Sequence, residues 1–399
     1  MDARARFLSV MNFEHCDRTM LWEFGYWEDT IRRWYEEGLP KQHKENLSKQ
    51  VDFSPTSMGF DNSICGEGLS WGGMVSASLD ADVHNYFGFD KGIMSIPVNS
   101  RLFPPFERKL LKDEGDNAVI IDDMGITKRV RKDGNSMPQY LAWPVENRND
   151  WERLKEERFQ VHIEKRLPEN WLELVKEYRK EGYILCCGYS ISFFELLRSL
   201  LGEVNLFTKY YEDPRLIKDI LNYLCDFWTD LWSQIFTQVR ADFAVIGEDI
   251  AYKNASLISP ATFREFMLPC YKKITSFLKD SGINTIIVDT DGNFWELIPL
   301  FLEGGITGFY PFEAQAGMDI MKVRENYPKL QILGGLDKTR IAAGNKEIDQ
   351  ELESKLPFML QHGGYVPHAD HLIPPDVSWE NFKYYRERLR EMVYKYGSC

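Results

Sequence analysis

Short apolar runs alternate with longer amphipathic stretches throughout the second half of the chain. Six such runs are YILCCG, ADFAVIG, NTIIVDT, ITGFYPFE, LQILGGLD and GYVPHAD, and helix-like text follows each of them. After Asp213, for example, apolar side chains recur every three or four positions between Ile217 and Leu231. Buried strands that alternate with helices of this length indicate βα units around a parallel sheet. We therefore expect the main run of βα units at residues 181–399.

The first half of the chain follows a different pattern. Residues 92–145 contain short alternating runs broken by DEGDN, DDMG and KDGN, which predicts a small antiparallel β-meander. Because six strands lie after residue 180, a barrel that closes at eight strands needs two more upstream. Residues 83–89 are the best candidate for one of them.

The whole pattern predicts one α/β domain over residues 1–399, a (β/α)8 TIM barrel. Residues 1–80 form its expected N-terminal extension, and the meander is an insertion. An open doubly wound sheet also fits six parallel strands. However, no strand is followed by GxGxxG, and GxxxxGK[ST] occurs nowhere, so the usual evidence for nucleotide binding is missing.

Charge and composition narrow the choice of partners and compartment. The 399 residues include 48 basic and 61 acidic side chains, a net charge of −13, which disfavours nucleic acid and anionic membranes as partners. No apolar run approaches the length that spans a bilayer, and the first residues lack the apolar core of a signal peptide. The seven cysteines include no CxxC pair, which is typical of reduced thiols. We expect a cytoplasmic protein, and its apolar content allows a homodimer.

Carboxylates follow five consecutive predicted strands. In a (β/α)8 barrel the reacting groups follow the C-terminal ends of the strands, because those loops converge on one face. The side chains at these positions are Tyr189, Glu248, Asp249, Asp289, Asp291, Glu313, Asp337, His368, Asp370 and His371. Helix capping or a salt bridge explains each acid alone, but together they favour a cluster with altered proton affinities or a bound cation.

Asp289 and Asp291 lie two residues apart at the end of a predicted strand. If the chain stays extended there, both carboxylates point to the same side and can hold one ion. An imidazole from His368 or His371 completes a site for a divalent metal, zinc first, with an open position for a substrate oxygen. Structural hydrogen bonding is an equal alternative for either histidine.

The aromatic segment LWEFGYWEDTIRRW supplies further candidates. Half of its rings are expected to pack against the barrel wall, but aromatic rims also bind flat or methylated ligands. The predicted substrate-binding residues are Trp22, Glu23, Tyr26, Tyr189, Glu313 and His368.

Four stretches make the chain resemble a known family. They are GEDIAYKNASLISPATFREFMLPCYKKI, VDTDGNFWELIPLFLEGGITGFYPFE, LGGLDKTRIA and GGYVPHADHLIPPDVSWENFKYY, and the similarity extends back through FGYWEDTIRRWYEEGLP. The chain resembles the uroporphyrinogen decarboxylase superfamily, whose members are (β/α)8 barrels. The superfamily includes porphyrinogen decarboxylases and the cobalamin-linked methyltransferases of anaerobes.

Two departures from the family motifs favour the methyltransferases. Decarboxylases hold the carboxylates of their substrate with an arginine-rich RQAGR motif, whereas this chain has WEFGYWED. The zinc methyltransferases that act on coenzyme M carry HxCGN where this chain has DTDGN, so Asp289 and Asp291 replace a histidine and a cysteine, and Gly363-Gly364 offers no thiolate. The resemblance therefore implies harder metal ligands, and the branch that transfers methyl groups from methyl ethers or methylated amines to a corrinoid protein.

The residues and the resemblance together predict a corrinoid-dependent methyltransferase. It demethylates a small methoxylated, aromatic substrate and passes the methyl group to cobalamin carried by a partner corrinoid protein. The predicted metal ligands are Asp289, Asp291 and His371, and the predicted catalytic residues are Glu248, Asp291 and His371. Two alternatives stay open: decarboxylase or lyase chemistry on a small acid in the same pocket, and a non-catalytic barrel that binds a cationic ligand or a metal.

Overall fold

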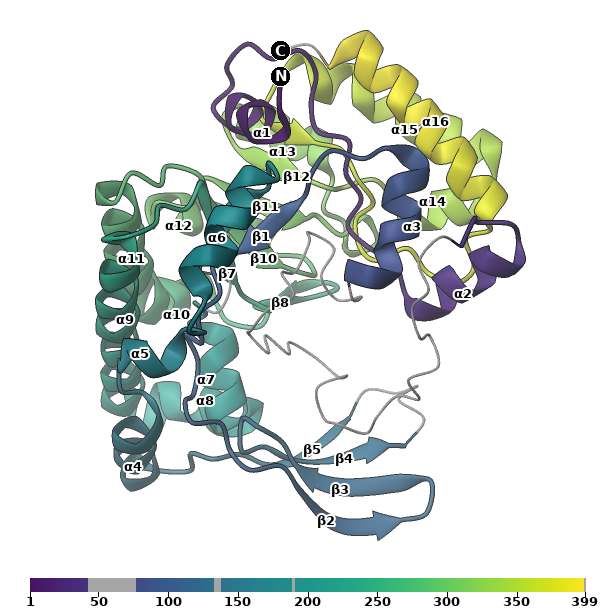
Figure 1. Cartoon of the computed structure of the whole chain (residues 1–399). Helices are drawn as coiled ribbons and strands as arrows, with labels where there is room; N and C mark the ends of the chain where they lie inside the picture. The colour runs from purple at the N-terminus through teal and green to yellow at the C-terminus, as the bar shows by residue number, and fades with distance from the viewer. Residues whose placement is uncertain (42–76, 133–137, 189–190, 398–399) are drawn as a thin grey trace.

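Seven parallel strands form a curled sheet at the centre of the molecule (Figure 1). The structure is a computed structural model that describes residues 1–41, 77–132, 138–188 and 191–397. The strands follow the order β1 (Ile93–Ser95), β6 (Ile184–Cys187), β7 (Phe243–Gly247), β10 (Ile286–Thr290), β11 (Gly308–Pro311), β12 (Gln331–Leu333) and β13 (Tyr365–Val366). Each pairs in parallel with its neighbours. This architecture confirms the predicted TIM-barrel-like α/β fold.

The N-terminal segment at residues 19–26 lies between the two edges of this sheet. On one side Thr19 Oγ1 donates a hydrogen bond to the carbonyl oxygen of Tyr365 in β13, 2.6 Å away. On the other side the Trp22 indole donates to the carbonyl oxygen of Lys91, just before β1. The described chain thus has seven strands in this sheet, where the sequence predicts eight, and an extended segment takes the remaining position.

The strand predicted at residues 83–89 is wrong. Most of that run belongs to α3 (Ala77–Phe87), in which Val83 is buried and the Phe87 ring packs 5.6 Å from that of Trp379. Apolar side chains four residues apart follow the period of a helix, and the run is too short to show that period clearly. The upstream barrel strand is β1 instead, which lies within the stretch predicted as meander.

The meander is a separate antiparallel sheet that begins later than predicted. Its strands are β2 (Lys109–Glu114), β3 (Asn117–Ile121), β4 (Thr127–Arg131) and β5 (Gln139–Ala142). This sheet projects from the barrel below α7 and α8 in Figure 1. Its cations pair with its own acids, as Lys128 does with Asp122 at 3.0 Å and Arg129 with Glu114 at 2.8 Å. Lys128 and Arg129 of β4 are therefore neutralised within the meander itself.

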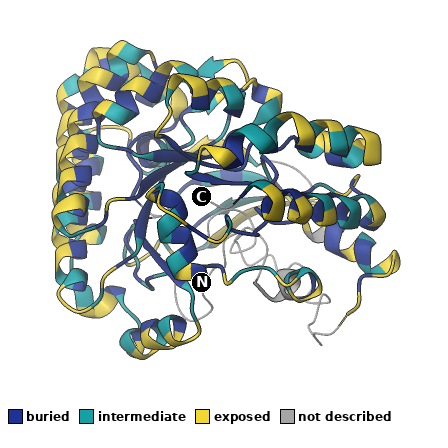
Figure 2. Cartoon of the chain, turned by 90° about the horizontal axis from the view of Figure 1, so that it is seen from above, coloured by how far each residue is buried: buried dark blue, intermediate teal, exposed yellow. Residues whose placement is uncertain are grey.

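Helices cover the outer face of the curled sheet. The longest in this wall, α9 (Pro214–Phe236), begins where Asp213 caps the backbone N–H of Leu216 at 3.1 Å, and its row of buried side chains matches the predicted stripe. Buried residues concentrate on the strands and on the inward helix faces (Figure 2). The remaining helices of four or more residues are α1 (Ala3–Met11), α2 (Glu28–Glu36), α4 (Arg148–Arg158), α5 (Ile163–Arg166), α6 (Trp171–Lys180), α7 (Phe194–Leu201), α8 (Glu203–Glu212), α11 (Leu268–Asp280), α12 (Ile298–Glu303), α13 (Ile320–Asn326), α14 (Lys338–Ala343), α15 (Asn345–Gln361) and α16 (Trp379–Tyr396).

Helix α1 closes the N-terminal end of the barrel. The Phe7 ring lies 4.9 Å from that of Phe243, the first residue of β7. Arg6 binds Asp17 at 2.7 Å and Asp90 at 2.8 Å, which ties α1 to the segments that follow it. Both chain ends lie on this side of the molecule (Figure 1). We call it the closed end.

Two further sequence predictions concern membranes and thiols. Among the described residues, none of the helices is long and apolar enough to cross a bilayer. Cys186, Cys187, Cys225 and Cys270 are buried free thiols. Cys16, in contrast, is disulfide-bonded, so the prediction of reduced thiols is wrong at that position. Sequence spacing does not reveal it, because Cys16 packs against the C-terminal segment at Gly397, 381 positions away.

Candidate active site

The side chains that face into the barrel change from apolar to polar along the strands. Strand geometry points every second residue inward. The apolar interior includes Val245, Ile287, Leu333 and Val366. The next inward positions, towards the C-terminal strand ends, hold Asp289, Tyr310 and His368. A polar layer therefore lies directly above an apolar floor.

Hydrogen bonds fix the residues of this polar layer. The Tyr310 hydroxyl donates to Asp289 Oδ2 at 2.8 Å. His368 is fully buried, and its Nδ1 lies 2.7 Å from the carbonyl oxygen of Ala369. Burial lowers the pKa of His368, so its ring is neutral, with the proton on Nδ1 and a lone pair on Nε2. Within the described chain, Nε2 has no hydrogen-bond partner.

Asp291 and His371 form an ion pair at the mouth of the barrel. His371 Nε2 lies 3.5 Å from Asp291 Oδ2, and the two side chains are 21% and 40% exposed. Burial alone lowers the pKa of His371, but the hydrogen bond and the charge of Asp291 outweigh it and raise that pKa above its usual value. The pair therefore favours the protonated form of the imidazole at a position that solvent reaches.

Phe24 places an aromatic ring beside this pair. It reaches into the barrel from the N-terminal segment, and its ring centroid lies 5.4 Å from that of His371, 5.8 Å from His368 and 5.9 Å from Tyr310. These separations are typical of packed aromatic rings. Phe24 thus connects the polar layer to the mouth through one continuous aromatic wall.

Asp249 adds a second carboxylate to the mouth. Burial and the charge of Asp291 raise its pKa. Its cationic neighbour Arg198 lies 3.4 Å away, but Arg198 also contacts Glu195 at 2.5 Å and Glu203 at 3.4 Å. Burial raises the pKa of Glu195 to about 7. One guanidinium is therefore shared by three carboxylates.

The meander also reaches this region. Burial, followed by the charge of Glu195, raises the pKa of Tyr140 in β5, and Asp249 adds to the effect. An electrostatic influence of this kind requires proximity. The β5 edge of the meander therefore borders the mouth.

Glu248 is engaged with helix α7. Its carboxylate accepts the backbone N–H groups of Phe193, Phe194 and Glu195 at 2.6, 2.9 and 3.0 Å, and the hydroxyl of Tyr271 at 2.7 Å. Burial raises the pKa of Glu248 to about 7, and these four donors oppose that rise. A carboxylate that caps a helix through both oxygens is a structural anchor. This geometry does not support the predicted general-acid role of Glu248.

The predicted metal site is not formed. Asp291 is paired with His371, whereas Asp289 is bonded to Tyr310 in the layer below. Across the residues that the structure describes, His, Cys, Asp and Glu side chains form no group of three that is able to hold a metal ion. The donor set of these described residues does not fit the zinc ion that the resemblance implies.

Of the predicted substrate-binding residues in the N-terminal segment, Glu23 and Tyr26 face away from the barrel. Glu23 is 1% exposed, pairs with Arg386 of α16 at 3.0 Å and accepts the backbone N–H of Ala369 at 2.8 Å. The Tyr26 ring packs 5.5 Å from that of Phe382 in α16. Both residues therefore connect α16 to the barrel.

The other four predicted substrate-binding residues lie in different places. The Trp22 ring lies 5.6 Å from that of Phe7 at the closed end. Tyr189 lies outside the described residues. Glu313 accepts the backbone N–H of Gly292 at 3.2 Å, so it borders the mouth next to Asp291. His368 belongs to the polar layer.

Two further strand-end acids have structural partners. Asp370 is fully buried and accepts the backbone N–H groups of Ala314 and Lys338 at 2.8 and 3.1 Å. Asp337 caps the first turn of α14 through the backbone N–H of Thr339 at 2.9 Å. These two acids match the helix-capping alternative, whereas Asp249 and Asp291 do not.

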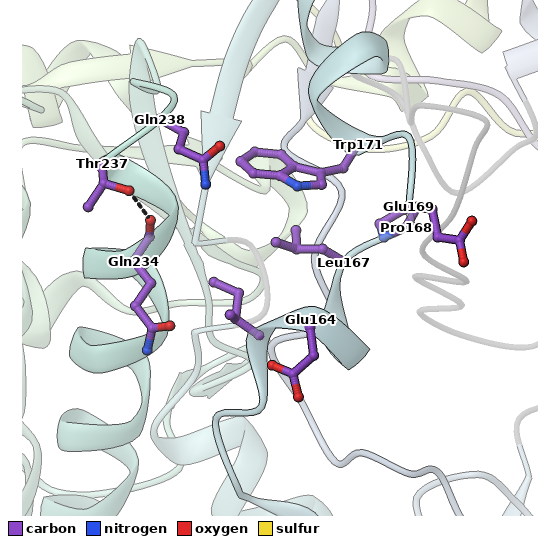
Figure 3. A pocket seen from close by; sticks show the side chains of 9 residues that line it. Glu164, Leu167, Pro168, Glu169, Trp171, Gln234, Thr237 and Gln238 are labelled. Carbon is purple, nitrogen blue, oxygen red and sulfur yellow. Dashed lines mark hydrogen bonds between the residues drawn. The ribbon is translucent and has the colours of Figure 1, made fainter.

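A hollow on the outer wall of the barrel is unrelated to this site. It has a volume of about 490 Å³ and lies between α5, α6 and the end of α9. Figure 3 shows Trp171 and Leu167 on one side of it and Gln238 on the other. Its acids are Glu164 and Glu169, and its lining includes none of the strand-end residues.

Sequence reasoning missed Phe24 and Arg198. The signal for Phe24 is its alternation with Trp22, because two residues of the same parity in an extended segment share a face. Arg198 follows its strand by about ten positions and has no local signal. Only the fold brings it to Asp249.

Comparisons with known proteins agree with the barrel. The family model described as Uroporphyrinogen decarboxylase (URO-D) matches residues 115–392. A solved structure described as a methyltransferase from Methanosarcina mazei is 16% identical, with a TM-score of 0.58, over 97% of this chain and 98% of that chain. A uronate isomerase from Bacillus halodurans C-125 is 9% identical over 55% of this chain and 53% of that chain, with a TM-score of 0.21. No curated protein matches the chain.

Proposed function

Because the chain belongs to the uroporphyrinogen decarboxylase (URO-D) family, we propose that it is a methyltransferase that demethylates a small methoxylated aromatic compound and delivers the methyl group to a corrinoid protein. The solved structure with the same fold that is described as a methyltransferase supports this assignment.

The ion pair of Asp291 and His371 carries the proposal. An ether oxygen leaves poorly unless an acid neutralises its developing charge. As the bond between the methyl carbon and the ether oxygen breaks, His371 gives its proton to that oxygen and becomes neutral. The role of Asp291 is to hold His371 in its protonated form before the reaction.

The corrinoid of the partner protein supplies the nucleophile for the methyl carbon when that protein is docked. This chain therefore needs only to hold the substrate, orient its ether and deliver one proton. Phe24 provides a flat surface against which an aromatic ring can pack, next to His371. The mouth supplies both functions within one small region.

The same mouth argues against porphyrinogen decarboxylation. A tetracarboxylate substrate needs free cations, but Asp249, Asp291 and Glu313 border this mouth. Arg386 is buried and paired with Glu23, so it does not replace the arginines of the decarboxylase motif. The geometry favours a small substrate without several negative charges.

A leaving-group series tests the role of His371. We expect His371→Gln to reduce demethylation of guaiacol by about a hundredfold, because a poor leaving oxygen depends on the proton. The loss should shrink to a few fold for a nitrophenyl methyl ether, whose oxygen leaves without help. The assay follows release of the phenol by chromatography with cob(I)alamin as the methyl acceptor.

The matched control is His362→Gln, which changes an exposed histidine at the end of α15. It should leave both rates unchanged. An equal loss for the two ethers in His371→Gln, or no loss at all, would show that His371 does not protonate the leaving oxygen.

A further inference from the structure

We infer that the substrate is an uncarboxylated methoxyarene that carries a hydroxyl group and presents this hydroxyl to His368 inside the barrel. The inference rests on the proposed function and names the substrate class within it. Three observations on the described residues carry it: an aromatic wall, an unpaired acceptor behind it and an excess of negative charge around the mouth.

The aromatic wall sets the shape of the ligand. Phe24 lies within 6 Å of the rings of His368, His371 and Tyr310. Phe24 is 8% exposed, so a flat substrate ring meets this cluster at the small part that stays open, by stacking or by an edge-to-face contact. An aromatic substrate that packs here has one end near the proton of His371 and the other directed towards the polar layer.

The acceptor in the polar layer sets the chemistry of the inner end. His368 lies two positions after Val366, which belongs to the apolar interior, so alternation directs His368 inward as well. Its Nδ1 is engaged with Ala369, and its Nε2 has no partner within the described residues. A buried acceptor without a donor is unfavourable. A hydroxyl on the substrate supplies the missing donor, whereas a carboxylate or a second ether oxygen does not.

The charges of the mouth exclude an anionic substrate. Asp249 and Asp291 face the same opening, and the raised pKa of Asp249 shows that the charge of Asp291 reaches it. Two cations of these loops already face carboxylates. Arg198 forms ion pairs with Glu195, Glu203 and Asp249. Lys338 lies 3.5 Å from buried Asp370. Among the described residues, a benzoate would enter an opening where Arg198 and Lys338 already face carboxylates and His371 is paired with Asp291.

Calorimetric titration of the full chain with four compounds tests the inference without turnover. Guaiacol carries both the ether and the hydroxyl, anisole lacks the hydroxyl, vanillate adds a carboxylate, and phenyltrimethylammonium replaces the ether by a cation. We expect guaiacol to bind about tenfold more tightly than anisole, because anisole leaves the His368 acceptor unpaired. We expect it to bind at least about tenfold more tightly than vanillate at low ionic strength, because two aspartates repel the added charge.

Two variants assign these differences to residues. Asp249→Asn should reduce the ratio of guaiacol to vanillate affinity, and His368→Phe should reduce the ratio of guaiacol to anisole affinity. The thermal midpoint of each variant is measured first, and His368→Gln, which retains an acceptor oxygen, serves as a second variant if the phenylalanine does not fold. Each variant should alter one ratio and leave the other unchanged.

Several results overturn the inference. They are equal or tighter binding of vanillate, equal binding of anisole, tighter binding of the ammonium compound, and the absence of binding by all four. Failure of the proposed function is a different result, because the affinities can follow the expected order while no methyl group is transferred to cob(I)alamin.

Discussion

The closed end and the mouth of the barrel use the same charged residue types in opposite ways. At the closed end Arg6 and Arg18 surround Asp90, which is 8% exposed, and Arg6 also binds Asp17. At the mouth Asp249 and Asp291 repel each other across an opening that solvent reaches, and Arg198 is divided among three acids. Cations are abundant at the first end and scarce at the second.

The pKa values of the acids at the two ends reflect this difference in available cations. The hydrogen bond from Arg6 lowers the pKa of Asp17, whereas burial and a neighbouring carboxylate raise the pKa of Asp249. Carboxylates that are fully paired stabilise the fold in their ionised form. Carboxylates crowded together in a cleft have raised pKa values, and shifts of this kind are common at functional sites. The pKa of an acid in this protein therefore depends less on how many acids lie nearby than on how completely each acid is paired with a cation.

The largest effect on stability is expected from Asp90→Asn at the closed end. Asp90→Asn removes the carboxylate that accepts hydrogen bonds from Arg6, Arg18 and the backbone of Leu21. Two guanidinium groups lose their buried partner, so the free energy of unfolding should fall by about 3 kcal/mol. Denaturant titration measures this change. The activity of the folded variant should match wild type, and a selective loss of activity without destabilisation would contradict the assignment of this end to stability.

A smaller effect is expected from Asp291→Asn at the mouth. The variant should keep its free energy of unfolding within about 1 kcal/mol of wild type, since the pair is partly exposed. Without the carboxylate the pKa of His371 falls, and the acid form is lost as pH rises through that lower pKa. The basic limb of the kcat/KM profile should therefore move to lower pH. An unchanged limb would show that Asp291 does not control the proton of His371.

The smallest effect is expected in the pH dependence of stability, from a substitution of Glu195. Glu195 has a folded pKa of about 7, raised from 4.5, so its contribution is fully present below about pH 4.5 and is lost as pH rises through 7. Asp17 has a lowered pKa, so its contribution is present above the unfolded pKa and is lost as pH falls. In wild type we expect the loss of the Glu195 contribution to lower the free energy of unfolding between about pH 5 and 8. Glu195→Gln should reduce that fall by about 1 kcal/mol, which is measured from thermal midpoints across this pH range. A decline as steep as that of wild type would show that Glu195 does not cause the loss of stability with rising pH.

Much of the barrel was predictable from the sequence, because its strands are short apolar runs between helices with clear starts. Asp213 and Ser259 each precede a proline and cap the helix that begins there, a start signal that is visible in the sequence. The closing segment was not predictable, since the partners of residues 19–26 lie far away in the sequence, as Tyr365 does for Thr19. Local periodicity carries no information about such long-range contacts.

The site was predictable only in part, for a related reason. Strand ends located Asp291 and His371, which the fold brings together. The same rule selected Glu248, whose backbone donors lie 53 to 55 positions earlier in the chain and turn the side chain away from the mouth. Position along a strand predicts where a residue lies, whereas the partner that engages it depends on the tertiary structure.

The most direct test of the central claim follows the methyl carbon of the substrate. The full chain is incubated with guaiacol whose methoxyl carbon is isotopically labelled, with cob(I)alamin as acceptor, and the labelled products are identified by mass spectrometry. We predict that the labelled methyl group appears on the cobalamin in an amount equal to the catechol released. His371→Gln should suppress the formation of both products. Label in methanol, label that remains in guaiacol, or turnover only of carboxylated substrates with loss of carbon dioxide would contradict these predictions.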